Sequence, residues 1–430
     1  MRAAIIAGGG GTRMGEISRT IPKPMLPIGG KPILEHQVEL LKNSGITSVT
    51  FCTKHLSTVI EDHFGDGKKW GIKINYSIED IPLGTAGCLR NAFPDCEDEL
   101  LVLYGDVMTY LDLDKMIRYH AATGADATLA VHSNDHPHDS DILEVDPTMK
   151  VVLIHPKPHP AGIWLPNLTN AAVYVLGPEI IKQIPVGRPS DCAHDIFPEA
   201  IRKGLKLQAY RTAEYIKDAG TPERYRKVSR DWDSGTVIRW HRKNPRPAVF
   251  LDRDGVLIEE VGHLHRQEDL RVLPGIGAAI RRINQAGFLA ILITNQPVIA
   301  RGLCSFNDLR TLHNKLETLL GREGARLDAI YFCPHHPDSG FPEEIPELKI
   351  DCDCRKPATG MIKQACSEFN IDLAGSWLIG DTTVDLETAR RAGIKSILVG
   401  TGYGGRDGRY PVKPEIRCRD LQAAVAHITY

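Results

Sequence analysis

The sequence predicts a two-domain α/β protein, and three observations carry that prediction. The chain has 430 residues, which is too long for one ordinary hydrophobic core. Short apolar runs alternate with longer amphipathic stretches, a pattern typical of mainly parallel strands joined by helices; the runs are AAIIA, SVTFC, ELLVLYG, AVFLD, LAILIT and SWLIG. This alternation of apolar and amphipathic segments stops over 227–247, which is polar and proline-bearing. We therefore expect a domain boundary there, with domains at 1–235 and 246–430.

Composition narrows the class of protein and its partners. Hydrophobic residues make up 42% of the chain and charged residues 25%, as in soluble globular proteins. A net charge of −2 gives no reason to expect nucleic acid or an anionic membrane as partner, and no apolar run could span a bilayer. Ten cysteines in a chain of this size indicate a reducing compartment with buried or metal-bound thiols, so we expect a cytoplasmic protein. The sequence leaves open whether it forms a homo-oligomer.

The first predicted strand runs into a glycine-rich loop, IIAGGGGTRMG, at 5–15. Glycines let the backbone approach phosphate, and successive N–H groups form an anion cradle. The loop is not a Walker A loop, because no Gly-Lys-Ser/Thr follows at the right spacing, and it does not fit Gly-x-Gly-x-x-Gly. By itself such a run is equally compatible with a flexible turn.

The following segment, IPKPMLPIGGKPILEH, places Lys23 between two prolines that stiffen its backbone. With the glycine loop it closely resembles the sugar-1-phosphate nucleotidyltransferase family. Further matches come in family order and extend the resemblance over about residues 1–230: EDIPLGTAG at 79–87, LYGDV at 103–107, TNAAVYVL at 169–176 and KDAGTPERY at 217–225.

The resemblance implies a Rossmann-like (GT-A-like) mixed sheet and assigns roles to particular residues. The triphosphate would be held by Gly8, Gly9, Gly10, Gly11, Thr12 and Arg13. Lys23 would neutralise charge near the α-phosphate, and Asp106 and Asp218 would share Mg²⁺, which prefers such oxygens. Near the base and the sugar the resemblance places Gly84, Thr85, Gly87, Asn170 and Lys157. Pro156 stands before Lys157 where the family often has glutamate.

The second half begins with AVFLDRDGVLIEE, a strand that ends in two aspartates two residues apart. This spacing allows a division of labour in which Asp252 attacks phosphorus and Asp254 protonates the leaving oxygen. With Thr294 in LAILITNQ, Lys356 in CRKP, and Asp381 and Asp385 in WLIGDTTVD, the order resembles the haloacid-dehalogenase-type phosphatases.

That resemblance implies a parallel α/β domain and an aspartyl-phosphate formed at Asp252. Thr294 and Lys356 would bind the transferred phosphoryl group, and Mg²⁺ would be held by Asp252, Asp254 and Asp381. Only about forty residues separate Asp254 from Thr294, so we expect no large cap domain. Loops would then recognise the substrate, with Asn295, Arg301 and Arg355 as candidate contacts.

One of these loops carries a candidate zinc site. Cys333-x-His335 and Cys352-x-Cys354 give three sulfurs and one imidazole, a closed structural-zinc set with no position left for water. Residues 246–428 resemble D-glycero-D-manno-heptose-1,7-bisphosphate 7-phosphatases, which carry this loop before Cys-Arg-Lys-Pro; histidinol-phosphate phosphatases are a rival resemblance. Pro297, Val298 and Thr382 depart from the heptose phosphatase pattern.

The two resemblances combine into successive reactions. The phosphatase would convert heptose 1,7-bisphosphate to heptose 1-phosphate, and the transferase would add a nucleoside monophosphate and release pyrophosphate. Pathway analogy favours GTP as donor, and products with ADP or CDP stay open, as does a histidinol-phosphate-type phosphatase. In an alternative of another class, one domain is an inactive sugar-nucleotide sensor; the full set of charged residues at the catalytic positions argues against it.

Overall fold

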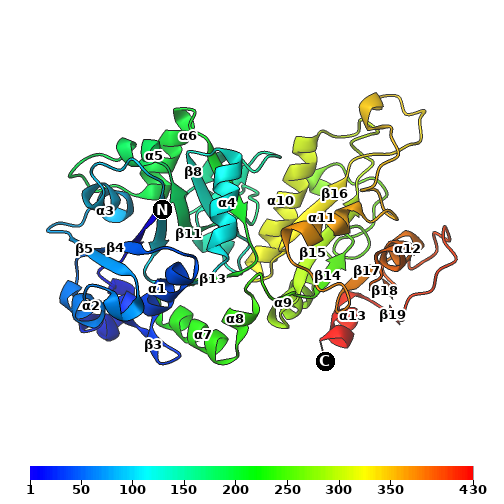
Figure 1. The fold of residues 1–430 in the computed structure, drawn as a ribbon. Helices are drawn as coiled ribbons and strands as arrows, with labels where there is room; N and C mark the ends of the chain where they lie inside the picture. Colours follow the sequence, from blue (N-terminus) through cyan, green and yellow to red (C-terminus); the bar gives the residue numbers. More distant parts are fainter. Residues whose placement is uncertain (430) are drawn as a thin grey trace. The chain divides into compact units, whose positions relative to one another are not determined.

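The computed structural model describes residues 1–429 as two compact units (Figure 1). The first unit comprises 1–132, 143–156 and 170–242, and the second comprises 133–142, 157–169 and the described residues from 243 onward. The division at 242/243 falls inside the polar stretch where the apolar pattern breaks. Two short segments from the first half of the sequence therefore belong to the second unit.

The first unit is built on a nine-stranded mixed sheet. Parallel pairing joins β1 to both β4 and β6, whereas β11 runs antiparallel to β6, so the predicted mixed sheet is confirmed. The strand order is β10 (Val151–His155), β9 (Ile142–Val145), β11 (Thr169–Leu176), β6 (Leu100–Tyr104), β1 (Arg2–Ile6), β4 (Ser48–Thr53) and β5 (Lys73–Ile78), with β8 (Ala127–His132) beside β11 and β12 (Leu207–Arg211) beside β8.

Two shorter pairings and a set of helices complete this unit. β7 (Val107–Tyr110) pairs antiparallel with β13 (Tyr215–Asp218), and β2 (Pro27–Ile28) pairs with β3 (Lys31–Pro32). Fully buried aliphatic side chains on β1, β4 and β6 form the centre of the core. The helices are α1 (Ile33–Asn43), α2 (Ser57–Phe64), α3 (Gly84–Ala92), α4 (Leu113–Thr123), α5 (Pro178–Gln183), α6 (Phe197–Arg202), α7 (Pro222–Asp233) and α8 (Thr236–Arg239).

The second unit has a six-stranded sheet in which every pairing is parallel, as predicted. Its order is β16 (Ala329–Cys333), β15 (Leu289–Asn295), β14 (Ala248–Leu251), β17 (Trp377–Gly380), β18 (Lys395–Val399) and β19 (Ile416–Cys418). Five helices flank the sheet (Figure 1): α9 (Ile276–Gln285), α10 (Phe306–Arg322), α11 (Gly360–Glu368), α12 (Thr383–Ala392) and α13 (Leu421–Ile428). Because β14, β15 and β17 are parallel neighbours, the residues after them meet at one edge.

The segments 133–142 and 157–169 pack on α10 within the second unit. Thr318 donates its hydroxyl to the Leu165 carbonyl at 3.0 Å and accepts from the Leu165 N–H at 3.1 Å. Glu317 accepts the backbone N–H of Asn167 at 3.2 Å. Among the described residues, no helix is both long and apolar enough to cross a membrane.

Candidate functional sites

Four charged side chains of the first unit converge where β6 and β13 end. The Nζ atom of Lys23 lies 3.9 Å from Oδ2 of Asp106. Gly220 lies among the others, since a Cβ atom added there would be 3.0 Å from Oδ1 of Asp218, 3.4 Å from Nη2 of Arg13 and 3.8 Å from Oδ2 of Asp106. The structure therefore brings together four residues that the sequence spreads over more than two hundred positions.

This cluster can hold a cation and a polyanion. Burial raises the pKa of Asp106, the nearby Asp218 carboxylate adds to the rise, and Lys23 and Arg13 oppose it. Arg224 donates to both oxygens of Asp218, at 3.1 and 2.9 Å. Two carboxylates so close together fit a hard divalent cation such as Mg²⁺, and the cationic side chains beside them fit phosphate oxygens.

The glycine loop after β1 presents open backbone. Cβ atoms added at Gly9 and Gly10 would have no heavy atom within 4 Å, and Gly11 takes a φ of 68° that favours glycine. Gly8 lies closer to other residues, since its Cβ would be 3.6 Å from Oε1 of Glu79. The side chain of Thr12 lies outside the part of the chain that the structure describes. The loop geometry leaves room for a phosphate group at Gly9 and Gly10.

The residues predicted to lie near the base pack against, or hydrogen-bond to, another segment of the same unit. Gly84 has a φ of 75°, and a Cβ there would lie 2.4 Å from the carbonyl oxygen of Ser190. At Gly87 a Cβ would be 2.8 Å from the Arg188 carbonyl oxygen. Thr85 donates its hydroxyl to Asp191 at 2.8 Å. The two glycines therefore allow the chain around Ser190 to pack against this loop.

The two predicted sugar contacts fall in different units. Asn170, at the start of β11, accepts the backbone N–H of Ala172 at 3.1 Å, where a φ of 57° kinks the strand. Lys157 belongs to a segment of the second unit and donates to the Asp139 carbonyl at 3.0 Å. Its half-exposed ammonium also lies 3.5 Å from the Asp139 carboxylate, so a local partner already holds it.

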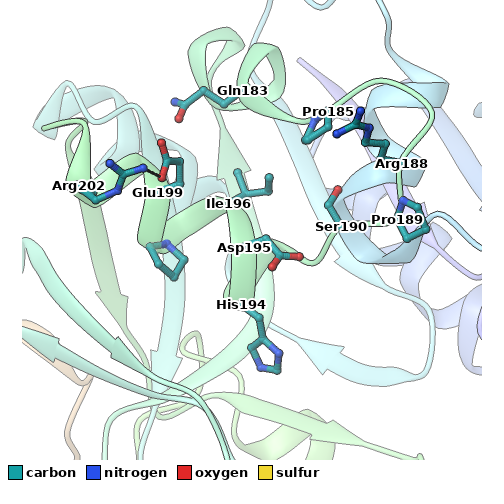
Figure 2. Close-up of a pocket in the computed structure, with 11 residues that line it drawn as sticks. Gln183, Pro185, Arg188, Pro189, Ser190, His194, Asp195, Ile196, Glu199 and Arg202 are labelled. Carbon is teal, nitrogen blue, oxygen red and sulfur yellow. Dashed lines mark hydrogen bonds and ion pairs between the residues drawn. The ribbon is translucent and has the colours of Figure 1, made fainter.

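A cavity of about 550 Å³ opens beside α6 in the first unit (Figure 2). Arg202 pairs with Glu199 at one end of it, and Arg188 extends at the other. The buried Ser190 lies on its wall and belongs to the segment that packs against Gly84. None of the residues predicted to bind nucleotide or sugar lines this cavity.

In the second unit, two aspartates that follow neighbouring strands and one at the start of a helix form one acidic cluster. Asp252 follows β14, Asp381 follows β17, and Asp385 lies in the first turn of α12; their oxygens lie within 4.8 Å of one another. Lys356 inserts its Nζ between two of them, 3.0 Å from Asp252 and 2.6 Å from Asp385. Asp254, which the sequence assigned to Mg²⁺, does not join this cluster and instead accepts from Arg253.

The electrostatics of this cluster favour binding of a cation. Burial, and then the neighbouring carboxylates of Asp385 and Asp254, raise the pKa of Asp252 to about 7, although Lys356 opposes the rise. Burial, followed by Asp252 and Asp385, raises the pKa of Asp381 to about 8. Carboxylates so close together cannot all ionise cheaply, and a hard divalent cation would relieve their repulsion. The donor set therefore fits Mg²⁺ held by Asp252 and Asp381.

Asn295 and Asp385 both hold Lys356 in place. The Asn295 amide accepts the Lys356 N–H at 2.9 Å and donates to the Lys356 carbonyl at 3.1 Å. Asp385 completes a capping box with Thr382 at the start of α12 while it binds Lys356. The Asn295 amide, a predicted substrate contact, thus already forms two hydrogen bonds with the backbone of Lys356. The role of Asp385 was missed, although its place three residues after a threonine before a helix is a recognisable capping signal.

The four predicted zinc ligands lie together in the second unit. Cys352 Sγ is 3.5 Å from Cys333 Sγ and 3.3 Å from Cys354 Sγ, and the Nδ1 atom of His335 is 3.3 Å from Cys354 Sγ. Zn–S bonds of about 2.3 Å in a tetrahedron require sulfurs roughly 3.8 Å apart. These separations are too long for a disulfide, whose sulfurs lie about 2 Å apart, and suit a single zinc ion.

The loop that carries this cluster also shapes the surroundings of Arg301. The Arg301 guanidinium stacks on the Phe341 ring at 4.5 Å, and its Nη2 lies 3.2 Å from Nε2 of His336. Gly302 has a φ of 73°, and a Cβ there would lie 1.8 Å from the Glu343 carbonyl oxygen. Arg355 donates to the His335 carbonyl at 3.0 Å. The cluster, Arg355 and Arg301 are therefore joined by one loop.

Comparison with known proteins assigns both halves. Residues 2–235 match the nucleotidyl transferase family, and residues 353–424 match the HAD-hydrolase-like family. The chain belongs to the nucleotidyl transferase family. The D-glycero-D-manno-heptose-1,7-bisphosphate 7-phosphatase of Thermosynechococcus vestitus is 44% identical over 191 residues, which cover 43% of this chain and 96% of that protein. The second half therefore belongs to this phosphatase family, and the predicted fusion is confirmed.

Relatives of the first half differ in the nucleotide that they are named for. A mannose-1-phosphate guanylyltransferase of Mycobacterium tuberculosis is 32% identical over 246 residues, covering 56% of this chain and 68% of that protein. A UTP–glucose-1-phosphate uridylyltransferase of a Synechocystis species is 34% identical over 223 residues, covering 49% of this chain and 57% of that protein. Overall identity alone therefore does not select the base.

Proposed function

We propose that the chain is a bifunctional enzyme of nucleotide-activated heptose synthesis. Its second half removes the 7-phosphate of D-glycero-D-manno-heptose 1,7-bisphosphate. Its first half then transfers GMP from GTP to the heptose 1-phosphate and releases pyrophosphate. The observation that carries the proposal is the 44% identity to a heptose bisphosphate phosphatase over nearly the whole of that protein. A phosphatase that leaves a sugar 1-phosphate suits a transferase that consumes one.

In the phosphatase, Asp252 attacks the 7-phosphorus atom and the bond from phosphorus to the sugar oxygen breaks. Lys356, held 3.0 Å from Asp252, offsets the negative charge that collects around the phosphoryl group, and Thr294 lies at the end of the neighbouring strand. Asp254 gives its proton to the sugar oxygen and later takes one from the attacking water. Asp252 and Asp381 would hold Mg²⁺, which would supply further charge neutralisation.

In the transferase, the oxygen of the sugar 1-phosphate attacks the α-phosphorus of the nucleoside triphosphate, and pyrophosphate leaves. The glycine loop with Arg13 binds the triphosphate, and Lys23 neutralises the α-phosphate. Asp106 and Asp218 would hold Mg²⁺, which would neutralise further charge on the same group. Lys23 is buried and lies beside Asp106, so its ammonium is held in place before the substrates bind.

GTP is the proposed donor because the guanylyltransferase relative aligns over more of its own length, 68%, than the uridylyltransferase does, 57%. The identity to that second relative makes UTP the competing donor. We further propose that the Cys₃His cluster binds structural zinc, because three thiols and an imidazole at these separations are a tetrahedral zinc set.

The test offers heptose 1,7-bisphosphate and Mg²⁺ with GTP, UTP, ATP or CTP in separate reactions and identifies the sugar nucleotide by mass. We expect GDP-heptose, inorganic phosphate and pyrophosphate with GTP, and at least tenfold less product with the others. Phosphate release without any sugar nucleotide would contradict the coupled pathway. Formation of UDP-heptose alone would overturn the choice of base and leave the two-step proposal standing.

A further inference from the structure

Beneath the Asp252-Arg253-Asp254 turn lies a buried polar network that the mechanism above does not use. Arg253 is 1% exposed, although arginine is seldom buried so completely. Its Nε donates to Oδ2 of Asp254 at 3.1 Å, and its Nη2 donates to Oδ1 of the same carboxylate at 3.0 Å. This two-pronged contact is the geometry that fixes a carboxylate in orientation as well as in position.

Gln296 extends the network to the next strand. Arg253 Nη2 donates to Oε1 of Gln296 at 2.8 Å, and Gln296 Nε2 donates to Asp254 Oδ2 at 3.0 Å. The same Nε2 lies 2.8 Å from the hydroxyl oxygen of Thr294. Gln296 is 2% exposed, so these contacts exclude water. One rigid group therefore spans Asp254 and the proposed phosphate-binding residue Thr294.

The far side of the guanidinium is closed by α10. Nη1 of Arg253 lies 3.4 Å from Nε2 of His313. Burial, with Arg253 adding to the effect, lowers the pKa of His313 to about 3, so the ring is neutral and accepts from the guanidinium. His313 in turn packs against Phe332 of β16, with ring centroids 5.7 Å apart. The network is thus supported by two elements remote from the turn itself.

The geometry has a consequence for proton transfer. A carboxylate offers about four acceptor positions, and three on Asp254 are used, two by Arg253 and one by Gln296. One direction remains for the proton that Asp254 exchanges. A buried arginine is also costly to desolvate unless it is paired, and Asp254 is the carboxylate it pairs with.

We propose that Arg253 is a positioning residue that, with Gln296 and His313, aims the one free acceptor position of Asp254 at the leaving oxygen. This inference rests on the phosphatase activity proposed above. In the first half-reaction Asp252 binds phosphorus, the phosphorus–oxygen bond of the substrate breaks, and the Asp254 proton goes to that oxygen. In the second, water attacks phosphorus, its proton goes to Asp254, and the bond between Asp252 and phosphorus breaks.

The test compares leaving groups in single-turnover reactions of the full chain. The alkyl phosphates, heptose 1,7-bisphosphate and glycerol 2-phosphate, need a proton on the leaving oxygen, whereas 4-nitrophenyl phosphate leaves as a stable phenolate. We expect Arg253→Met to slow alkyl phosphate cleavage about 100-fold, the size of a lost general acid, and 4-nitrophenyl phosphate cleavage less than about threefold. Arg253→Lys, which keeps the charge without the two-pronged geometry, should fall between the variant and wild type with alkyl phosphates.

Arg246→Met is the matched control, because Arg246 is also buried in this unit and donates to the Gly287 carbonyl, away from Asp254. It should lower thermal stability without changing the ratio of the two rates. If Arg253→Met does not fold, His313→Leu replaces it and should lower the ratio in the same direction. Equal losses with both leaving groups, or no loss, overturn the inference. Wild-type protein that cleaves glycerol 2-phosphate but not the heptose bisphosphate overturns the proposed substrate and leaves the inference testable.

Discussion

At the scale of single residues, both candidate sites are built by side chains that follow a strand. Asp106 follows β6, Asp252 follows β14 and Asp381 follows β17. The apolar strands of each unit hold these carboxylates at the edge of its own sheet, half-buried or buried, and in the second unit Asp252 and Asp381 lie close together. Burial and neighbouring carboxylates raise the pKa of Asp106 and of Asp252. Lys23 opposes the rise at Asp106, and Lys356 opposes it at Asp252. We infer that each site is held ready for a cation.

The raised pKa values of Asp252 and Asp381 predict how stability depends on pH and metal. An unfolded aspartate ionises near pH 4, whereas in the fold these two resist ionisation until about pH 7 and pH 8. The folded state then binds more protons than the unfolded state, so the free energy of unfolding of metal-free protein should fall as pH rises from about 4 to 8. Mg²⁺ should reverse this loss.

Thermal unfolding at pH 5 and pH 8, with EDTA or with 5 mM Mg²⁺, measures the effect. We expect the rise in Tm on adding Mg²⁺ to be several degrees larger at pH 8 than at pH 5. Asp381→Asn removes one carboxylate from the cluster and serves as the control, because it should reduce the difference between the two pH values. A larger Mg²⁺ effect at pH 5 would contradict the assignment of the cluster as a cation site.

Sequence patterns located charged residues that the structure brings together, but they did not always show which neighbouring groups those side chains bind. Asp252, Lys356 and Asp381 stand in ordered motifs, and the structure brings them together. The Asn295 amide has the same chemistry whether it binds substrate or the Lys356 backbone, and only the fold shows that it binds the backbone. Likewise, the tight approach of Ser190 to Gly84 depends on chain 106 residues away.

At the scale of elements, the loop between β16 and α11 joins a proposed metal site to the proposed substrate site. Apart from the single short helical turn Pro346–Leu348, residues 334–359 contain no helix or strand. Such a loop has few backbone hydrogen bonds to hold its shape, so cross-links from side chains must do so. The Cys₃His cluster ties both ends of the loop, and Arg355 and Lys356 follow the last cysteine directly.

Cys352→Ala should release this loop. We expect loss of about one zinc per chain, a fall of roughly 2 kcal/mol in the stability of the second unit, and thus about 5 °C in its Tm. The Michaelis constant for the phosphatase substrate should rise because Arg355 and Lys356 lose their fixed direction. Metal analysis after dialysis, thermal unfolding and phosphatase kinetics measure the three effects.

Cys366→Ala is the matched control for that variant. Cys366 lies on α11 in the same unit, is partly buried, and is outside the cluster. It should keep its zinc and its Michaelis constant. Zinc-free wild-type protein, or a Cys352→Ala variant as stable as wild type, would refute the role of the cluster.

The elements also show where sequence periodicity stops being informative. Each apolar run used for the fold prediction is a strand in the structure. Strands buried on both faces of a parallel sheet have short, nearly continuous apolar sequences, so these runs can be recognised without knowledge of the tertiary contacts. The ribbon of β7 with β13 was not predicted, since its strands are four residues each and lie 105 residues apart. Yet this ribbon brings Asp218 to Asp106, so the transferase site depends on a contact without a local signal.

At the scale of the whole molecule, each unit has its own buried core and its own set of charged residues. The second unit recruits 133–142 and 157–169, so a division of the chain at residue 242 would remove segments that pack on α10. For this reason the independence of the two proposed activities is better tested with substitutions in the full chain than with truncated halves.

Two full-length variants that each lack one activity should complement each other. Asp252→Asn removes the nucleophile and should lower phosphate release by roughly 10⁴-fold or more, while it still makes sugar nucleotide from supplied heptose 1-phosphate. Asp106→Asn should do the reverse, because it removes one of the two carboxylates proposed to hold Mg²⁺ in the transferase. Each variant alone should then fail to convert heptose 1,7-bisphosphate and GTP to sugar nucleotide, and an equimolar mixture should succeed after a lag while free heptose 1-phosphate accumulates.

Loss of both activities in either single variant would contradict separate sites, and a mixture that makes no product would show that the intermediate does not leave the chain that forms it.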